Sequence, residues 1–135
     1  MTVAEKSRAR RLEKFFNLTV ELWDIIHAYQ HGVCASCGLP QKSGKRLALD
    51  HSHKTGVVRG LLCSTCNRLL GRIERTYAKG VDIVKILDNL AAYLRESPAT
   101  KALGREIRTF PGRFGTKRHR KYLADQKHPS RGLKA

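Results

Sequence analysis

Two pairs of cysteines frame the part of the chain that is best equipped for chemistry. Cys34 and Cys37 form one Cys-x-x-Cys pair, and Cys63 and Cys66 form another. Thiolates bind Zn²⁺ tetrahedrally at about 2.3 Å, and each such turn places two sulfurs on one side of the ion. The polar, basic start of the chain does not resemble an export signal, which favours metal ligands over disulfides. The spacing therefore predicts a closed, structural zinc site.

Residues suited to phosphodiester hydrolysis lie between and just after these pairs. Asp50 and His51 are adjacent, and Asn67 directly follows the last cysteine. A histidine can take a proton from water, while a divalent cation on hard oxygen ligands binds the phosphate and helps the leaving oxygen. Asp50 and Asn67 offer such oxygens, and Mg²⁺ is the default ion because it takes few protein ligands. We expect a hydrolytic site with His51 as the base.

The elements around this site follow from periodicity and turn chemistry. Thr19 predicts the N-cap of a helix that stops near Gly32. Residues 47–51 and 57–60 predict a hairpin, and a helix beginning at Ser64 or Thr65 should carry Asn67 in its first turn. Neighbouring residues of a regular strand face opposite sides, so Asp50 and His51 need a bulge or bend to act together.

The flanking segments are less distinctive. Residues 1–11 are expected to be disordered or loosely helical. Residues 81–95 predict an amphipathic helix whose wide apolar face should be buried against the N-terminal helix or a second subunit. Pro98 is expected to end that helix. Beyond it we expect an extended basic arm with a short helix near Tyr122.

Charge is concentrated in two parts of the chain. The net charge is +16, of which residues 34–76 carry +6 and residues 101–135 carry +9. This asymmetry favours a polyanionic partner, most simply nucleic acid, over a basic protein that is merely soluble. No apolar run reaches the roughly 18 residues of a membrane helix, so no membrane partner is expected.

The run Leu49–Asn67 closely resembles the phage recombination endonuclease VII family, which belongs to the His-Me finger (HNH, ββα-metal) nucleases. Residues 32–38 resemble the first zinc knuckle of that family, and the similarity covers roughly residues 18–96. It implies an α+β fold with a small zinc-stapled ββα-metal core and flanking helices, and the charge of the chain adds a basic C-terminal arm that lies outside the resemblance. The corresponding domains are a basic segment (1–17), the nuclease domain (18–97) and the DNA-binding arm (98–135).

The same resemblance implies a role for each site residue. Asp50 and Asn67 would bind a catalytic Mg²⁺ or Mn²⁺, His51 would be the general base, and His53 would assist it. The zinc ligands would be Cys34, Cys37, Cys63 and Cys66. The chain departs from the family at Leu70, where a helical carboxylate is expected. Glu74, one turn further on, is a candidate substitute.

The resemblance also implies cleavage of branched DNA, including Holliday junctions, by a homodimer. A phage or prophage protein acting in the bacterial cytoplasm would fit it. Two alternatives stay open: a nicking or homing-type HNH nuclease on ordinary duplex DNA, and a non-catalytic zinc module that binds DNA.

Basic side chains near the site and in the arm are candidate DNA contacts. Arg59 fits a phosphate contact and a structural ion pair equally well. Lys54, Arg68 and Arg72 could touch the DNA backbone beside the site. The arm offers phosphate contacts that position DNA without reading its sequence, or else a solvated run of charge: Arg113, Lys117, Arg118, Arg120 and Lys121.

Overall fold

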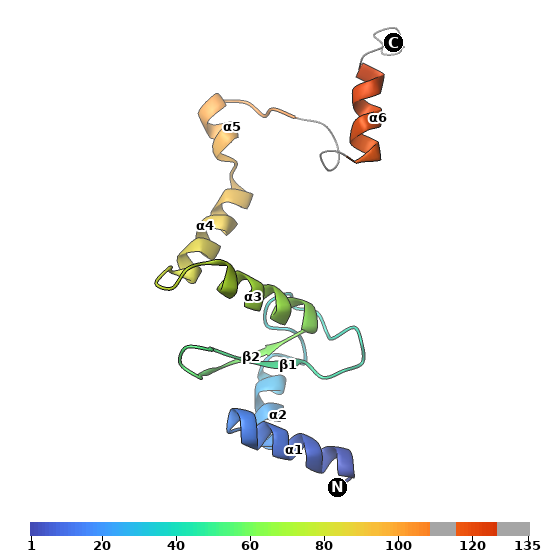
Figure 1. Ribbon diagram of the computed structural model, residues 1–135, viewed down its shortest axis with the longest axis vertical. Helices are drawn as coiled ribbons and strands as arrows, with labels where there is room; N and C mark the ends of the chain where they lie inside the picture. Colours follow the sequence, from blue (N-terminus) through green and yellow to red (C-terminus); the bar gives the residue numbers. More distant parts are fainter. Residues whose placement is uncertain (109–115, 127–135) are drawn as a thin grey trace. The chain divides into compact units, whose positions relative to one another are not determined.

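The computed structural model describes residues 1–108 and 116–126 (Figure 1). In chain order its elements are α1 (Val3–Phe16), α2 (Val20–Tyr29), β1 (Ala48–His51), β2 (Val58–Leu62), α3 (Ser64–Thr76), α4 (Ile83–Arg95), α5 (Pro98–Leu103) and α6 (Lys117–Gln126). They fall into two units, Met1–Ile83 and Val84–Ala135. The cysteines, the hairpin and the helix that carries Asn67 all belong to the first unit.

α1 is a regular helix with a well-formed start. The Thr2 hydroxyl accepts a hydrogen bond from the Glu5 backbone N–H, and the Glu5 carboxylate accepts one from the Thr2 backbone N–H. This reciprocal capping box satisfies two N–H groups that a helix start leaves unpaired. Of the two expectations for residues 1–11, the helix is found from residue 3 onward and the disorder is not. The expectation of disorder weighed the basic composition and overlooked the Thr2–Glu5 spacing.

α2 begins as predicted. The Thr19 hydroxyl accepts a hydrogen bond from the Leu22 backbone N–H at 3.3 Å, and Trp23 on this helix is buried. The helix ends at Tyr29, three residues before Gly32. Gly32 adopts a left-handed φ of 72° in the turn that leads to the first cysteine pair.

β1 and β2 form an antiparallel hairpin whose pairing register shifts between Asp50 and His51. Asp50 pairs with Gly60, whereas His51 pairs with Val58, so the register skips Arg59. A bulge near Asp50 and His51 was expected, and the structure confirms it, with the extra residue on the opposite strand. A bulge re-aims side chains and increases the local twist.

α3 starts directly after the hairpin, at the residue that the sequence predicted. Its N-cap is Cys63, whose sulfur accepts a hydrogen bond from the Cys66 backbone N–H at 3.4 Å. α3 contacts both strands, and α2 contacts β2. In Figure 1 the hairpin accordingly lies between α3 and the α1–α2 pair.

A small core joins these elements. Leu61 and Cys34 are its most deeply buried side chains, at 0% and 1% exposure. The other buried members are Leu12, Leu18, Trp23, Leu47, Leu62 and Cys63. Two of the four cysteines are thus part of the hydrophobic core, so a metal bound by these thiols would be coupled to folding.

The second unit contains three helices in the described residues. α4 confirms the predicted amphipathic helix, and its apolar side chains are largely exposed, with Val84 at 69% and Leu94 at 83%. What covers this face stays a prediction. Pro98 does not end α4, which stops at Arg95, but occupies the first turn of α5, where its missing N–H is harmless. α6 contains Tyr122, as expected for a short helix in the arm.

None of the helices in the described part of the chain is long and apolar enough to span a bilayer.

Candidate functional site

The sulfur atoms of the four cysteines form one cluster. They all lie within 4.8 Å of one another, and the sulfurs of Cys37 and Cys63 are 3.9 Å apart. Four thiolates at about 2.3 Å from a tetrahedral zinc lie about 3.8 Å from each other. The donor set and its spacing therefore fit zinc. The described residues contain no other such group of three or more Cys, His, Asp or Glu side chains.

Backbone hydrogen bonds hold the cysteine cluster from both sides. The Cys34 backbone N–H donates to the Leu39 carbonyl oxygen at 2.9 Å, and the Gly38 N–H donates to the Cys34 carbonyl oxygen at 2.9 Å. The Ala35 N–H donates to the Leu61 carbonyl oxygen at 3.1 Å, which ties the first knuckle to β2. The cluster thereby fixes the hairpin and the start of α3 relative to each other.

Two thiols of the cluster have displaced pKa values. Burial alone would raise the pKa of Cys34, but the backbone N–H groups of Cys37, Cys63 and Ser36 outweigh it and lower this pKa to about 6. Hydrogen bonding to the Cys63 thiol raises the pKa of Cys66 to about 12. The turn around Cys34 thus already stabilises a thiolate, which is the form that binds zinc.

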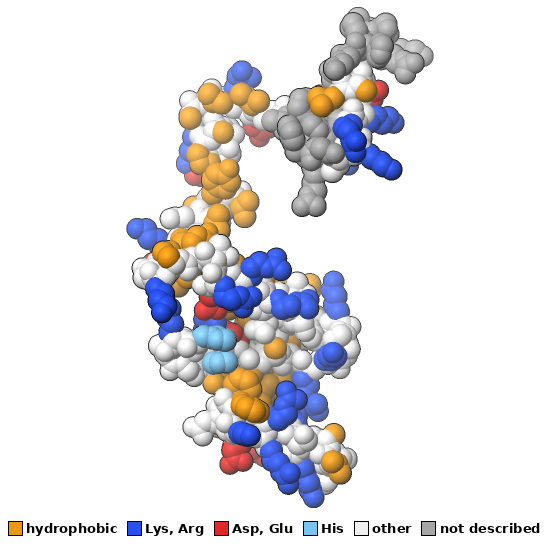
Figure 2. Space-filling view, viewed as in Figure 1, with side chains coloured by type: hydrophobic (Ala, Val, Ile, Leu, Met, Phe, Trp, Pro, Cys, Tyr) orange, Lys and Arg blue, Asp and Glu red, His pale blue; other side chains and the backbone are white. Residues whose placement is uncertain are grey.

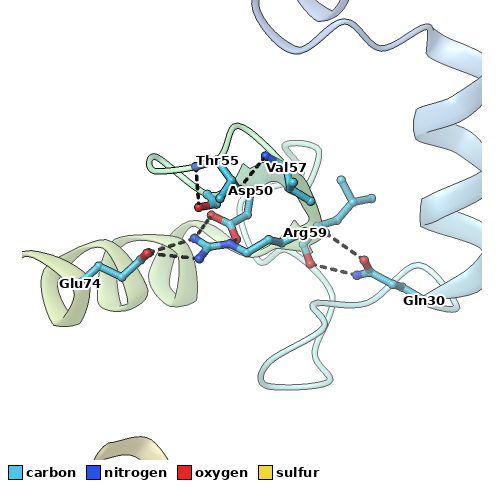
Figure 3. Close-up of polar contacts among 8 residues, drawn as sticks. Gln30, Asp50, Thr55, Val57, Arg59 and Glu74 are labelled. Carbon is cyan, nitrogen blue, oxygen red and sulfur yellow. Dashed lines mark hydrogen bonds and ion pairs between the residues drawn. The ribbon is translucent and has the colours of Figure 1, made fainter. Parts of the chain in front are cut away.

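Arg59 on β2 joins two carboxylates (Figure 3). Its Nε donates to Asp50 Oδ2 at 2.7 Å and its Nη2 donates to Asp50 Oδ1 at 3.1 Å. The same guanidinium donates to both carboxylate oxygens of Glu74 on α3, at 2.9 and 3.2 Å. The register skip that leaves Arg59 unpaired in the ladder brings its side chain to this position.

The ion pairs of Arg59 with Asp50 and Glu74, called the Arg59 bridge below, shift the pKa values of Arg59 and Glu74. Asp50 is 8% exposed, so its charge needs the paired guanidinium. Hydrogen bonds to Glu74 and Asp50 raise the pKa of Arg59 above its ordinary value. The Arg59 guanidinium lowers the pKa of Glu74, which also lies within electrostatic reach of Asp50 and His53. Glu74 therefore interacts electrostatically with both Asp50 and His53.

The two histidines of the hairpin lie together. The rings of His51 and His53 stack at a centroid distance of 4.8 Å with an interplanar angle of 16°. The Phe16 ring, from the end of α1, meets the His51 ring edge-on at 5.5 Å. Figure 2 shows histidine side chains beside acidic and basic ones on the viewed face. His51 is thus held from two sides by ring contacts.

The Gln30 side chain connects the end of α2 to β2 through hydrogen bonds (Figure 3). Its amide N–H groups donate to the Val33 and Leu61 carbonyl oxygens, both at 2.9 Å, and its Oε1 accepts from the Leu61 N–H at 2.9 Å. Gly60, the partner of Asp50, has a φ of 151°, and a Cβ there would lie 3.0 Å from Gln30 Oε1. Glycine is needed where the backbone passes so close.

The predicted cation ligands are only partly brought together. Asp50 and Glu74 face each other through Arg59, and Asn67 lies half-buried in the first turn of α3. Leu70, where the family resemblance predicts a carboxylate, packs against the core. It also lines a pocket of about 230 Å³ beside Asp50 and Arg59. Oxygen donors from Asp50, Asn67 and Glu74 suit Mg²⁺ or Mn²⁺ chemically, but both oxygens of Asp50 are engaged by Arg59.

The candidate DNA contacts fall into different groups. Lys54, Arg68 and Arg72 are exposed near the site, whereas Arg59 is engaged in the carboxylate bridge. Four arm residues are exposed on α6: Lys117, Arg118, Arg120 and Lys121. Arg113 lies outside the described residues.

Sequence reasoning missed one residue of the site, Phe16, and the link between two residues that it had named. The contact of Phe16 with His51 depends on a regular α1, which extends beyond the segment expected to be disordered or loosely helical. The link from Arg59 to Glu74 joins a strand to a helix fifteen residues later. A basic residue opposite Asp50 in the hairpin and a glutamate on the following helix were the available signals.

Comparison with known proteins connects this geometry to a family. A sequence model described as recombination endonuclease VII matches residues 9–96. The chain is 38% identical to the gene 59 protein of Mycobacterium phage D29 over 97 residues, 72% of this chain and 55% of that protein. It is 37% identical to the gene 59 protein of Mycobacterium phage L5 over 87 residues, 64% of this chain and 49% of that protein. The chain thus spans about half the length of these relatives.

Proposed function

Because the chain belongs to the recombination endonuclease VII family, we propose that it is a metal-dependent DNA endonuclease with a His-Me finger mechanism. The observation that carries the proposal is the position of His51. Its ring lies between Phe16 and His53 and next in sequence to Asp50, on a hairpin that the cysteine cluster ties to α3. A hydrolytic site needs such a preorganised base.

His51 is the proposed general base. Its imidazole would take a proton from the water that attacks phosphorus, a step that needs a neutral ring near operating pH. Contacts with Phe16 and His53 restrict the rotation of the ring, so one nitrogen can be held toward the water. His53 is proposed to assist by positioning His51 and by interacting with Glu74.

Asp50 and Asn67 are the proposed ligands of the catalytic cation, with Glu74 in place of the carboxylate that Leu70 lacks. A bound Mg²⁺ or Mn²⁺ would neutralise charge on the phosphate and on the leaving oxygen. Arg59 occupies both oxygens of Asp50, so it must give up at least part of this pairing when a cation binds. A guanidinium released in this way stays close enough to contact a phosphate oxygen. The zinc has a structural role only, because four thiolates leave no open position.

The proposed substrate is DNA with a branched structure. The family description concerns recombination, and the positive charge of residues 34–76 and 101–135 supports a phosphate backbone as partner. We propose that two chains act together, with the exposed apolar face of α4 as part of their interface. The mycobacteriophage relatives support an action in the cytoplasm of a bacterial host during phage growth.

A cleavage assay on matched substrates tests this proposal. The zinc-loaded protein is incubated with Mg²⁺ or Mn²⁺ and with a four-way junction, a nicked duplex or a linear duplex of the same arm sequences. The proposal predicts divalent-dependent strand cleavage that is strongest on the junction. Equal or preferential cleavage of the plain or nicked duplex would replace it by the duplex nuclease. Binding without cleavage under every condition would leave the non-catalytic zinc module.

A further inference from the structure

A groove runs between α1 and the chain segment that enters β1. Its volume is about 770 Å³. The α1 side contributes Arg8, Arg11 and Phe16, and the hairpin side contributes residues 45–49. In Figure 2, Lys and Arg side chains gather over the α1 end of the viewed face. This groove is separate from the cysteine cluster and from the carboxylate bridge.

The charged side chains that line the groove are all cationic. They are Arg8, Arg11, Lys45 and Arg46. The nearest carboxylates, Glu5, Glu13 and Glu21, line a neighbouring depression that Arg8 and Arg46 also border. Arg46 acts electrostatically on Glu5. The side chains at one rim therefore carry both signs of charge, whereas the charged side chains inside the groove are all positive. A positive electrostatic potential there suits an anionic ligand.

Arg8 lines both the groove and the neighbouring depression and carries an unsatisfied donor. Its guanidinium lies over the Trp23 ring, 4.7 Å from the ring centroid. Its Nη2 atom is buried and has no hydrogen-bond partner. A buried charged donor without a partner is destabilising. Because Nη2 is not accessible in this conformation, the guanidinium must turn toward the groove to donate a charge-assisted hydrogen bond to a phosphate oxygen.

The groove leads to the proposed general base. Phe16, at one end of the groove, contacts the His51 ring, and Leu49 lies two residues before His51. Phe16 lies eight positions after Arg8 on the helix, a rise of about 12 Å. That length matches a few successive phosphates of one strand, since B-DNA rises about 3.4 Å per base on each strand.

From these observations we propose that the groove between α1 and β1 binds the sugar–phosphate backbone of a DNA strand and leads it to His51. Arg8, Arg11, Lys45 and Arg46 contact its phosphates, and Arg8 Nη2 donates to one of their oxygens. The contacts are made to backbone and not to base edges, so they add affinity and position without sequence preference. This inference rests on the proposed nuclease function in naming His51 as the destination of the strand.

The test compares two double variants that remove the same charge. Arg11→Gln/Lys45→Gln alters the groove. Lys6→Gln/Arg10→Gln alters α1 residues that do not line it. Both are made in a His51→Ala background, and the affinity for a fluorescent duplex and a four-way junction is measured over a range of salt concentrations. Zinc content and thermal unfolding establish that each variant is folded.

The groove variant should raise Kd about tenfold at moderate salt, for any DNA sequence. The slope of log K against log salt concentration should fall in magnitude by about 2, or about 0.9 for each lost phosphate contact. In the control variant, Kd and the salt slope should each change by less than half as much as in the groove variant. Equal changes in both variants, or none in the groove variant, would overturn the proposal. Arg8→Gln, made alone because Arg8 stacks on Trp23, should lower the slope by about 1, and an unchanged slope in the folded variant would remove the Arg8 contact.

The binding readout separates this inference from the nuclease assignment. If the wild-type protein cleaves DNA and the groove variant retains full affinity, the groove proposal fails and the nuclease stands. If the wild-type protein never cleaves but binds DNA through the groove, the nuclease fails and the groove remains a DNA-binding site.

Discussion

The cysteine cluster and the carboxylate–histidine face, formed by Asp50, His51, His53, Arg59 and Glu74, are held by different forces. Backbone hydrogen bonds and burial fix the cysteines, and Cys34 is only 1% exposed. Side-chain ion pairs and ring stacking hold the other face, where the Arg59 side chain is 34% exposed. Backbone contacts resist rearrangement, whereas a side-chain pair can be exchanged for a cation or a phosphate. We therefore expect the first region to maintain the architecture and the second to carry out the proposed reaction.

Removing one thiolate should have the largest effect. Cys63→Ser takes away a predicted zinc ligand that also belongs to the core and caps α3. Structural zinc contributes on the order of 10 kcal/mol to folding, comparable to the whole stability of a small domain. We expect loss of zinc, by metal analysis, and loss of cooperative unfolding, by circular dichroism. The exposed neighbour Thr65→Ala should change neither, and a folded, zinc-loaded Cys63→Ser protein would refute the four-thiolate site.

Removing Arg59 should have a smaller effect that a cation reverses. Arg59→Gln leaves the buried Asp50 carboxylate without its partner, at a cost of about 2–4 kcal/mol, reduced by the partial exposure of Arg59. Mg²⁺ or Mn²⁺ should therefore raise the melting temperature of the variant more than that of the wild type. Lys54→Gln removes the same charge from the adjacent turn and is the matched control. Identical responses of Arg59→Gln and the wild type to the cation would separate Asp50 from cation binding.

Gly60→Ala should disturb the link between the two regions. The new Cβ would lie 3.0 Å from Gln30 Oε1 at a backbone φ of 151° that disfavours side chains. We expect a loss of about 1–3 kcal/mol in urea unfolding. Gly56→Ala, also at positive φ but with no atom near the new Cβ, should lose less. Equal losses would mean that the Gln30 contact does not position the hairpin.

The smallest expected effect is a pH dependence of stability. The Arg59 guanidinium lowers the pKa of Glu74 in the folded state below its ordinary 4.5. The unfolded state therefore binds the proton more readily, and the ion pair contributes stability above about pH 4.5 that is lost as the pH falls through the folded-state pKa. Glu74→Gln should be less stable than the wild type by about 0.5–1 kcal/mol near neutral pH, and this difference should shrink in acid.

Urea unfolding of both proteins over a pH series, without divalent cations, measures this difference. Loss of thiolate–zinc bonding in acid affects both proteins and cancels in the comparison. A difference that stays constant or grows as the pH falls would show that the Arg59–Glu74 pair does not stabilise the fold.

The two regions also differ in how far the sequence predicted them. Cysteine spacing, the Thr19 cap and the start of α3 depend on neighbouring residues, and each is found where local rules place it. The bulge was expected because Asp50 and His51 alternate in a regular strand. The location of the extra residue on β2 was not expected, because it depends on how the two strands pair. The Arg59 bridge depends on the relative placement of a strand and a helix, which no local pattern contains.

α1 shows a different kind of omission. The Thr2–Glu5 capping box is a local signal that was present and was outweighed by basic composition. Without α1, neither the Phe16 contact to His51 nor the basic groove beside it could be anticipated. The catalytic roles of His51, Asp50 and Asn67 stay predictions that only activity measurements can test.

The most direct test of the account is single-turnover cleavage of a four-way junction by His51→Ala with saturating Mg²⁺ or Mn²⁺. A general base contributes about 10²–10⁴-fold to the rate. We expect a loss of that size, with zinc content, melting temperature and junction affinity unchanged. His31→Asn, an exposed histidine at positive φ outside the site, should cleave at the wild-type rate. Undiminished cleavage by the folded His51→Ala protein would contradict the assignment of His51 and the reaction built around it.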